Sequence, residues 1–252
     1  MKIVLIGAGN LATHLGASLR EAQHEIVQVY SRTERSAQQL AHQLSCSYTT
    51  DLHTLHTDVD IYIYALKDDI IHQVMQQVHI PHALHLHTAG SVSLFQADNG
   101  NYGVMYPLQT FSKERPINFQ EIPICIEANN CDSLHIIRTL ALSISDNVHI
   151  ISSEQRRQLH LAAIYACNFV NCLYANAEEI MENAQLPFEL LCPLIQETAA
   201  KVKEIRPSNA QTGPAKRGDT KVMQHHLDLL HSDLQKEIYR LLSKDIHMRH
   251  NK

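Results

Sequence analysis

The feature that most restricts the fold of this 252-residue chain is a glycine-rich turn near its start. Residues 2–7 form an apolar run typical of a buried strand, which leads into the pattern G-x-G-x-x-A, with Gly7, Gly9, Asn10, Leu11 and Ala12. The first glycine permits a tight turn, the second lets a pyrophosphate approach the backbone, and the alanine allows a helix to pack closely. A helix that starts here offers free N–H groups to phosphates. The pattern therefore predicts a dinucleotide site, and a glycine turn without a ligand is the alternative.

Short apolar runs and helical patterns alternate beyond this turn. We expect strands at 2–7, 25–30, 60–66, 83–87, 103–105, 122–127 and 148–151, and helices at 10–22, 34–44, 69–78 and 131–142. Alternating units of this length predict a parallel sheet with helices on both faces. Because crossovers between parallel strands are right-handed, the expected fold is a doubly wound α/β domain.

The character of the sequence changes after Ser152. No strand pattern follows, and helices are expected at 154–183, 187–205, 220–230 and 233–243, the first of them capped by Ser152 and Ser153. Residues 1–151 are thus predicted to form an NAD(P)-binding Rossmann domain, and residues 152–252 an all-α domain for substrate binding and dimerisation. Apolar residues occupy more than one face of the first helix, which predicts burial on several sides and a homodimer.

Composition narrows the classes of function. The formal net charge is -5 and no apolar run has the length of a membrane span, so we expect neither nucleic acid nor a membrane as a partner. Six cysteines without a C-x-x-C pair are typical of reduced thiols, and the chain does not open with a signal-peptide pattern, so we expect a cytoplasmic location. The eighteen histidines are spread along the whole chain, and no metal site is expected.

The end of the second predicted strand bears on the choice of cofactor. NAD-selective domains place an acidic residue there, which binds the ribose 2′-hydroxyl. This sequence has Ser31, Arg32 and Thr33 instead. Since a hydroxyl and a guanidinium suit a 2′-phosphate, NADP is the predicted cofactor. In the alternatives, Arg32 is an ordinary solvated side chain, or Glu34 neutralises it or replaces the missing acid.

Three further segments carry a resemblance to a known family. Residues 87–91 read H-T-A-G-S and resemble H-T-S-G, residues 106–111 read Y-P-L-Q-T-F and resemble H-P-L-Q-T-F, and residues 212–219 read T-G-P-A-K-R-G-D and resemble T-G-P-x-x-R-G-D. With its two predicted domains, the chain resembles the 6-phosphogluconate-dehydrogenase-like superfamily, which includes pyrroline-5-carboxylate reductase and the deazaflavin-dependent NADP oxidoreductases. Within it, the motifs resemble Rossmann-like proteins whose helical domain has no known function. The chain departs from the pattern at Ala89 and Tyr106, where serine and histidine are usual.

Further candidate residues follow from the strand ends. The resemblance implies that the turn at Ala65, Leu66 and Lys67 passes beside the adenosine and the nicotinamide ribose. Ligands of open α/β sheets bind at the carboxyl ends of strands, which places His87 and Thr88 near the nicotinamide. His87 is a candidate proton donor, because the pKa of histidine lies near neutral pH. The alternative is a strand-end histidine that only satisfies backbone groups.

The helical half supplies three more candidates. In β-hydroxyacid dehydrogenases the helix equivalent to 154–183 resembles G-x-x-x-K-x-x-x-N, whose lysine donates the proton. Here Asn168 matches the asparagine, Ile164 replaces the lysine, and His160 one turn earlier is a candidate substitute on the same face. Arg217 is a candidate clamp for an acidic substrate, and Asp219 a candidate helix cap.

The leading hypothesis is an NADP(H)-dependent oxidoreductase that transfers a hydride to or from a small carbonyl, imine or hydroxyacid. A non-catalytic dinucleotide-binding sensor or regulatory module is the alternative, because the usual catalytic lysine is absent and the motifs depart from the family pattern at two positions. Since many functions share this fold, the fold does not decide between them.

Overall fold

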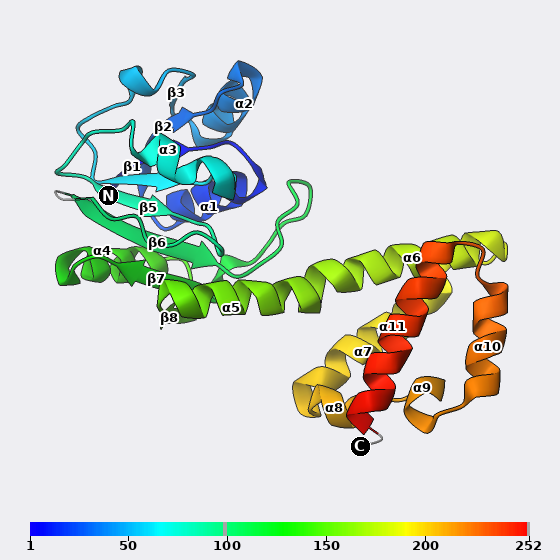
Figure 1. Cartoon of the computed structure of the whole chain (residues 1–252). Coiled ribbons are helices and arrows are strands. Elements are labelled where there is room, and N and C mark those ends of the chain that lie inside the picture. The colour runs from blue at the N-terminus through cyan, green and yellow to red at the C-terminus, as the bar shows by residue number, and fades with distance from the viewer. Residues whose placement is uncertain (98–99, 251–252) are drawn as a thin grey trace. The chain divides into compact units, whose positions relative to one another are not determined.

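The computed structural model describes residues 1–97 and 100–250 and divides the chain into two compact units, Met1–Cys167 and Asn168–Lys252 (Figure 1). The first unit holds one eight-stranded sheet in the order β3-β2-β1-β4-β5-β6-β7-β8. Its strands are β1 (Lys2–Ile6), β2 (Glu25–Tyr30), β3 (Ser47–Thr49), β4 (Ile61–Tyr64), β5 (Leu84–His87), β6 (Asn101–Pro107), β7 (Ile124–Ala128) and β8 (Val148–Ile150).

Helices connect these strands. They are α1 (Asn10–Glu21), α2 (Glu34–Leu44), α3 (Ile71–Met75), α4 (Cys131–Leu142) and α5 (Ser153–Ala163), with short 3-10 turns η1 (Leu52–Thr54), η2 (Asp68–Ile70) and η3 (Phe119–Glu121). β1 lies between β2 and β4, so the chain reverses its direction of travel across the sheet there. The predicted doubly wound Rossmann fold is confirmed.

One strand pair corrects the prediction of a parallel sheet. β7 runs antiparallel to β6, and β8 then lies parallel to β7. Parallel neighbours need a crossover connection, usually a helix. The segment from β6 to β7 contains only η3, so the chain returns in the opposite direction. β3 was not predicted, because its three residues, Ser-Tyr-Thr, lie at the sheet edge and carry no apolar pattern.

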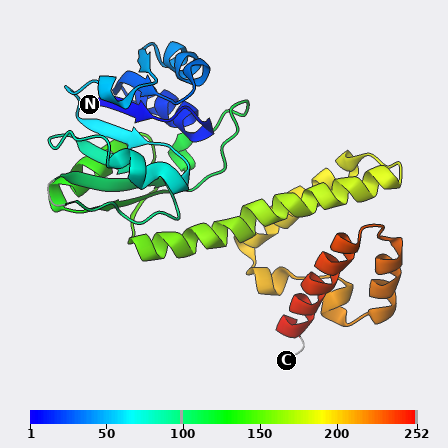
Figure 2. The same cartoon turned by 45° about the horizontal axis from the view of Figure 1, so that its top comes forward.

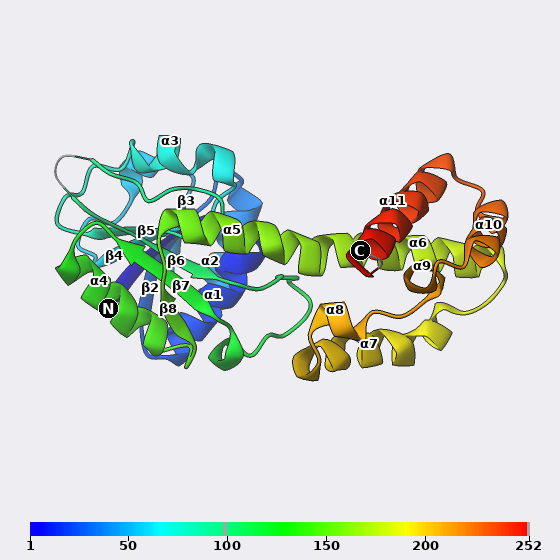
Figure 3. The same ribbon diagram turned by 60° about the horizontal axis from the view of Figure 1, so that its bottom comes forward.

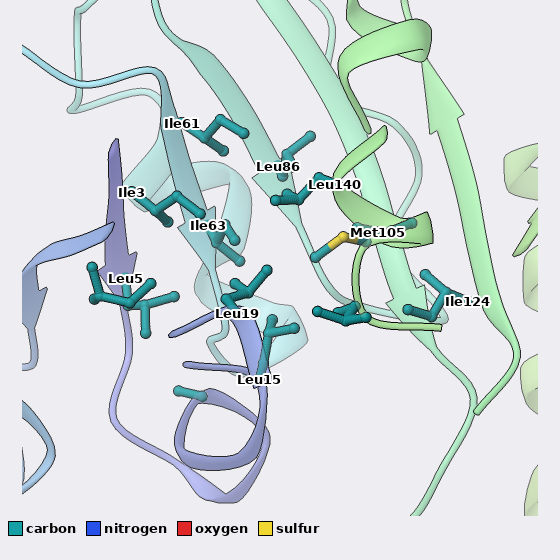
Figure 4. Close-up of a cluster of buried hydrophobic side chains, with 14 of the residues drawn as sticks. Ile3, Leu5, Leu15, Leu19, Ile61, Ile63, Leu86, Met105, Ile124 and Leu140 are labelled. Carbon is teal, nitrogen blue, oxygen red and sulfur yellow. The ribbon is translucent and has the colours of Figure 1, made fainter. Parts of the chain in front are cut away.

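Side chains alternate between two apolar layers, one on each face of the sheet. Ile3 and Leu5 pack with Leu15 and Leu19 of α1 and with Leu140 of α4 (Figure 4). The other face packs against α3 and α5, as Figure 3 shows for the side of the sheet opposite α1 and α4. Because both faces are covered, β4 and all but the first residue of β1 carry apolar or aromatic side chains, whereas β5 alternates leucine with the buried His85 and His87.

The long helix expected at 154–183 is interrupted. α5 begins with a capping box, in which the Ser152 side chain accepts from Gln155 and the Gln155 side chain accepts from Ser152, so the predicted cap is Ser152. A π turn, η4 (Ile164–Asn168), separates α5 from α6 (Phe169–Asn183). α5 packs on the sheet through Leu159, and the first compact unit therefore continues to Cys167, beyond the last strand.

The second unit contains helices throughout its described residues, 168–250 (Figure 2). After α6 come η5 (Phe188–Leu191), α7 (Cys192–Glu204), α8 (Pro207–Ala210), α9 (Pro214–Arg217), α10 (Thr220–Leu229) and α11 (Asp233–His250). Among these described residues only Ala215 is buried. The expected burial of the long helix on several sides is therefore not met within one chain. None of the described helices is both long and apolar enough to span a membrane.

Candidate active site

The strand register brings most of the predicted cofactor residues to one edge of the sheet. Ile6 pairs with Tyr30 and with Tyr64, and Tyr64 pairs with His87, so four strands reach the same level. The next residue in each case lies at the carboxyl edge: Gly7, Ser31, Ala65 and Thr88. This is the edge at which open α/β sheets bind their ligands, beside the reversal between β1 and β4.

The β1–α1 turn has room for a phosphate. Gly7 has φ +121°, and a Cβ there would collide with the backbone carbonyl of Ala65. Gly9 has φ -83°, and no described atom lies within 4 Å of the place where its Cβ would be. No described side chain caps α1, which leaves the first N–H groups of the helix for an anion. These open N–H groups and the space above Gly9 fit a pyrophosphate.

The remaining turn residues have structural contacts. Ala12 is fully buried, and Leu11 packs against the core, so both hold α1 close to the sheet. The Asn10 side chain donates to the carbonyl of Phe111 at 2.8 Å and so ties the loop after β6 to the start of α1. That loop therefore borders the phosphate site.

The end of β2 presents the residues expected to select the cofactor. Ser31 is half-buried, and its hydroxyl accepts from the Thr33 N–H at 3.4 Å. Arg32 and Thr33 are exposed. Within the described part of the chain Arg32 forms no salt bridge, and Glu34 is the first residue of α2 rather than its partner. The guanidinium is thus available to a 2′-phosphate.

The ends of β4 and β5 complete the edge. Ala65 and Leu66 are half-buried and Lys67 is exposed. Thr88 is buried, and its hydroxyl donates to the Tyr64 carbonyl at 3.2 Å. Ala65 contacts Gly7 closely, so this turn lies beside the glycine turn.

His87 is fully buried with both ring nitrogens occupied. Nδ1 accepts from the Ala89 N–H at 3.3 Å, and Nε2 lies 3.1 Å from the Ser93 carbonyl, to which it donates. Burial, assisted by the positive charge of Arg156, lowers the pKa of His87 to about 3. The ring is therefore neutral near pH 7, and its contacts agree with a histidine that satisfies backbone groups.

A tyrosine and a histidine meet at the end of β6, where no catalytic pair was predicted. The hydroxyl of Tyr106 lies 3.0 Å from Nδ1 of His160 on α5. Val104 pairs with His87, so Tyr106, two residues further, projects beyond the end of β5 on the same face as Val104. Tyr106 is buried, which, together with the nearby Cys125 and Asp68, raises its pKa to about 12. The phenol keeps its proton at neutral pH.

Two residues of the H-T-A-G-S segment, Gly90 and Ser91, lie beside this pair. A Cβ on Gly90 would lie 2.6 Å from His160 Nδ1 and 2.9 Å from Tyr106 Cζ, so Gly90 packs directly against both rings. The next residue, Ser91, donates a short hydrogen bond to Asp68, which follows β4. The resemblance of residues 87–91 to H-T-S-G had pointed to this segment, but it did not predict the contact with Tyr106 and His160.

A buried ion pair fixes the start of α5. The fully buried Arg156 donates to Glu127 of β7 at 2.5 Å and to the Val92 carbonyl at 2.5 Å. Glu127 also accepts from the N–H and hydroxyl of Ser153. Although burial favours the neutral acid, hydrogen bonds from Arg156 and Ser153 hold the pKa of Glu127 below its usual range. This network holds α5, and with it His160, against the sheet.

The candidates in the second unit have less specific surroundings. Asn168 is exposed, and its side chain forms no hydrogen bond within the described residues. The π turn adds a residue to the helical turn, so the even spacing of 160, 164 and 168 no longer defines one face. Arg217 is exposed at the end of α9, and Asp219 caps α10 as predicted. The described residues contain no group of three or more metal-binding side chains.

Comparisons with known proteins agree with this geometry. Residues 2–88 match the family model described as "NADP oxidoreductase coenzyme F420-dependent", and residues 122–246 match a domain of unknown function, DUF2520. A crystal structure of a provisionally named NADP oxidoreductase from Bacteroides fragilis is 45% identical, covers 98% of each chain and has a TM-score of 0.94. No curated protein sequence matches the chain.

More distant structures share the fold. A pyrroline-5-carboxylate reductase from Streptococcus pyogenes is 16% identical over 98% of both chains, with a TM-score of 0.65. An imine reductase from Myxococcus stipitatus, solved with NADP⁺, is 15% identical over 98% of this chain and 92% of the other, with a TM-score of 0.63. The comparisons do not favour the alternative of a non-catalytic sensor. The chain therefore belongs to a family of NADP oxidoreductases that join a Rossmann domain to a DUF2520 domain, and its cofactor is NADP.

Proposed function

We propose that the protein reduces a small carbonyl or imine with NADPH, or runs the reverse oxidation, at the carboxyl edge of β4, β5 and β6. The observation that carries this proposal is the hydrogen bond between Tyr106 and His160 beside the end of β5. It puts a protonated phenol at the sheet edge on which the predicted cofactor residues converge. When bound, NADPH supplies a hydride to the electrophilic carbon of the substrate.

We assign the proposed cofactor contacts to three parts of NADPH: the pyrophosphate, the 2′-phosphate and the nicotinamide half. The N–H groups at the start of α1 and the open space at Gly9 hold the pyrophosphate, and Ser31, Arg32 and Thr33 hold the 2′-phosphate. Ala65, Leu66, Lys67 and Thr88 border the nicotinamide half. These roles are supported by the open environment of Gly9 and by Arg32, which forms no salt bridge with the residues that the structure describes.

The proposed proton donor is Tyr106, assisted by His160. Reduction of a C=O or C=N bond leaves an oxygen or nitrogen that must gain a proton, and a phenol with a pKa of about 12 is protonated at the working pH. His160 is only half-buried, so it is able to exchange protons with water and to return one to the phenolate. His87, buried and neutral, holds the loop after β5 in place. Asn168 and Arg217 remain candidate substrate contacts from the helical unit.

We further propose a cytoplasmic homodimer. The second unit exposes many large apolar side chains, among them Leu190, Leu194, Leu234 and Leu241, which a second copy would cover. All six cysteines are free, which agrees with a reducing compartment.

The test begins with fluorescence titration of the purified protein by NADPH and NADH, for the wild type and for Arg32→Ala. Loss of the 2′-phosphate contact should weaken NADPH binding about tenfold or more and leave NADH binding unchanged. NADPH oxidation is then followed with a panel of small imines, ketones and 2-oxo acids. Tight NADPH binding without turnover of any of these classes would contradict the proposed reductase.

A further inference from the structure

Two helices of the second unit, α10 and α11, enclose a groove (Figure 1). At one end, Nδ1 of His226 on α10 lies 2.8 Å from the hydroxyl of Tyr239 on α11. At the other end, the start of α10 lies beside the end of α11, because a Cβ on Gly218 would be 3.7 Å from the His247 ring. The helices therefore run antiparallel, with a hollow of about 390 Å³ between these two contacts. We call this hollow the α10–α11 groove.

The T-G-P-A-K-R-G-D segment forms the second of these ends. Gly218 has φ +71°, a left-handed conformation that favours glycine, and it turns the chain from α9 into α10. Asp219 then caps α10 by accepting from the Val222 N–H at 3.3 Å. The short helix α9 packs against both α10 and α11. This segment therefore fixes the position at which α10 begins relative to α11.

The lining of the groove combines apolar surface with positive charge. Met223 and Leu227, one turn apart on α10, are half-buried, as is the ring of Tyr239 on α11. Arg240 and Lys244, one turn apart on α11, are exposed and line the same groove. Among the described residues, no aspartate or glutamate lines it.

Arg240 and Lys244 are not paired with the acids of these helices. Neither side chain forms a salt bridge within residues 1–97 and 100–250. Glu237, three residues before Arg240, is exposed and does not line the groove. The other acids of α10 and α11 have their own partners: Asp228 with Gln224, Asp233 with Lys236 and Asp245 with Arg249. The groove therefore offers two available cations beside apolar surface.

The groove is on a different face of α11 from the leucines for which a second copy is proposed as cover. Ser243 lies near the middle of the α11 face that lines the groove. Since successive residues of a helix are about 100° apart, Leu241 and Leu234 lie about 160° and 180° from Ser243 around the helix axis. A second copy that packs on these leucines of α11 leaves the groove open.

We propose that the α10–α11 groove is a binding site for a small organic anion, a carboxylate with an aromatic or branched apolar body. The body packs on Met223, Leu227 and the ring of Tyr239. The carboxylate accepts charge-assisted hydrogen bonds from Arg240 and Lys244. The volume suits such a ligand, because small-molecule pockets begin at about 300 Å³. This site does not depend on the proposed reductase.

The test uses indole-3-acetate as the probe. The chain contains no tryptophan, so the indole fluorescence of the probe can be excited selectively. Its anisotropy at low ionic strength should rise on titration with the full-length protein, with a dissociation constant below about a millimolar. Indole-3-acetamide lacks only the charge and should bind about tenfold weaker. Acetate lacks the apolar body and should not displace the probe.

Variants assign the charge effect to this groove. Arg240→Gln and Lys244→Gln should each weaken binding of indole-3-acetate about threefold and leave that of indole-3-acetamide unchanged. Lys221→Gln is the matched control, because Lys221 is an exposed lysine of α10 that does not line the groove. It should change neither affinity.

Several outcomes would overturn the proposal. The wild type may show no rise in anisotropy, the acid and the amide may bind equally, or the Lys221 control may lose as much affinity as the two test variants. Light scattering of the double variant Arg240→Gln/Lys244→Gln gives a further readout. An unchanged mass is expected, whereas dissociation to the monomer would show that a second copy, and not a small anion, occupies the groove.

Discussion

At the scale of single residues, the chemistry of the site depends on how burial shifts the pKa values of two side chains, Tyr106 and His87. Tyr106 is held protonated because burial raises its pKa to about 12, and its hydroxyl touches His160. Tyr106→Phe removes only that hydroxyl and keeps the ring against Gly90. Since positioned general acids contribute about 10²- to 10⁴-fold, we expect kcat to fall at least about a hundredfold. Steady-state kinetics, with NADPH affinity measured in parallel, checks this.

A second tyrosine on the same strand supplies the control. Tyr102 lies at the opposite end of β6, among His85 and Phe95, so Tyr102→Phe should leave kcat within about twofold. Equal losses in the two variants would mean that the phenol at Tyr106 acts on stability rather than on proton transfer.

The buried His87 makes stability depend on pH. Its folded pKa of about 3 lies below the ordinary value of 6.5, so between these values the unfolded chain binds more protons than the folded one. The contribution of His87 to stability is therefore complete above pH 6.5 and is lost as the pH falls toward 3. Between pH 7.5 and 5 the loss is about 2 kcal/mol.

Urea unfolding at these two pH values, for the wild type and for His87→Gln, isolates this contribution. Glutamine keeps one donor for Ser93 and one acceptor for Ala89 but does not titrate. The variant should lose about 2 kcal/mol less than the wild type on acidification. An identical loss in both proteins would show that His87 does not titrate on unfolding.

At the scale of elements, substitutions at the two glycines of the β1–α1 turn should have different effects, one on stability and the other on NADPH affinity. A Cβ on Gly7 would strike the Ala65 carbonyl at φ +121°, so Gly7→Ala should destabilise the protein by more than about 1 kcal/mol. Gly9 has open space and an ordinary φ, so Gly9→Ala should leave the melting temperature nearly unchanged. Its methyl group would occupy the phosphate space, and NADPH affinity should fall at least tenfold.

Thermal unfolding and NADPH titration of both variants check this pair. If Gly9→Ala keeps its NADPH affinity, the β1–α1 turn does not bind the phosphates of the cofactor. A stable Gly7→Ala protein would mean that β1 and β4 separate easily at their ends.

The same turn illustrates what the sequence predicts well. A short glycine pattern, the strand before it and the helix after it are local, so their order specified the turn and the edge on which Ser31 and Thr88 lie. The Tyr106–His160 pair is different, because its partners are 54 positions apart and meet only when Arg156 and Glu127 fix α5 on the sheet. The π turn after α5 could not be predicted either, because the spacing of apolar residues in the sequence does not change there. Tyr106 was noticed as a departure from the family pattern and His160 as a candidate proton donor, but the contact between them was not predicted.

At the scale of the whole molecule, the two compact units differ in how they bury apolar surface. The sheet unit has core layers on both faces, whereas the described residues of the helical unit, 168–250, bury only Ala215. Leu194 and Leu241 are both 63% exposed in the single chain. An apolar surface of this kind is rarely left open to water, which is why we propose a second copy as its cover.

We therefore expect light scattering to give twice the chain mass of 28.6 kDa at micromolar concentration. A glutamate in this apolar surface would be buried without a partner in the dimer, which costs free energy, but stays in water in the monomer. Leu194→Glu and Leu241→Glu should therefore each shift the equilibrium toward the monomer. Leu142→Glu is a matched control, because Leu142 is an exposed leucine, 48% accessible, on α4 of the sheet unit. It should leave the mass unchanged. A monomeric wild type, or a control that dissociates as readily as the two test variants, would argue that the helical unit is not the dimer interface and that its apolar side chains are covered in another way.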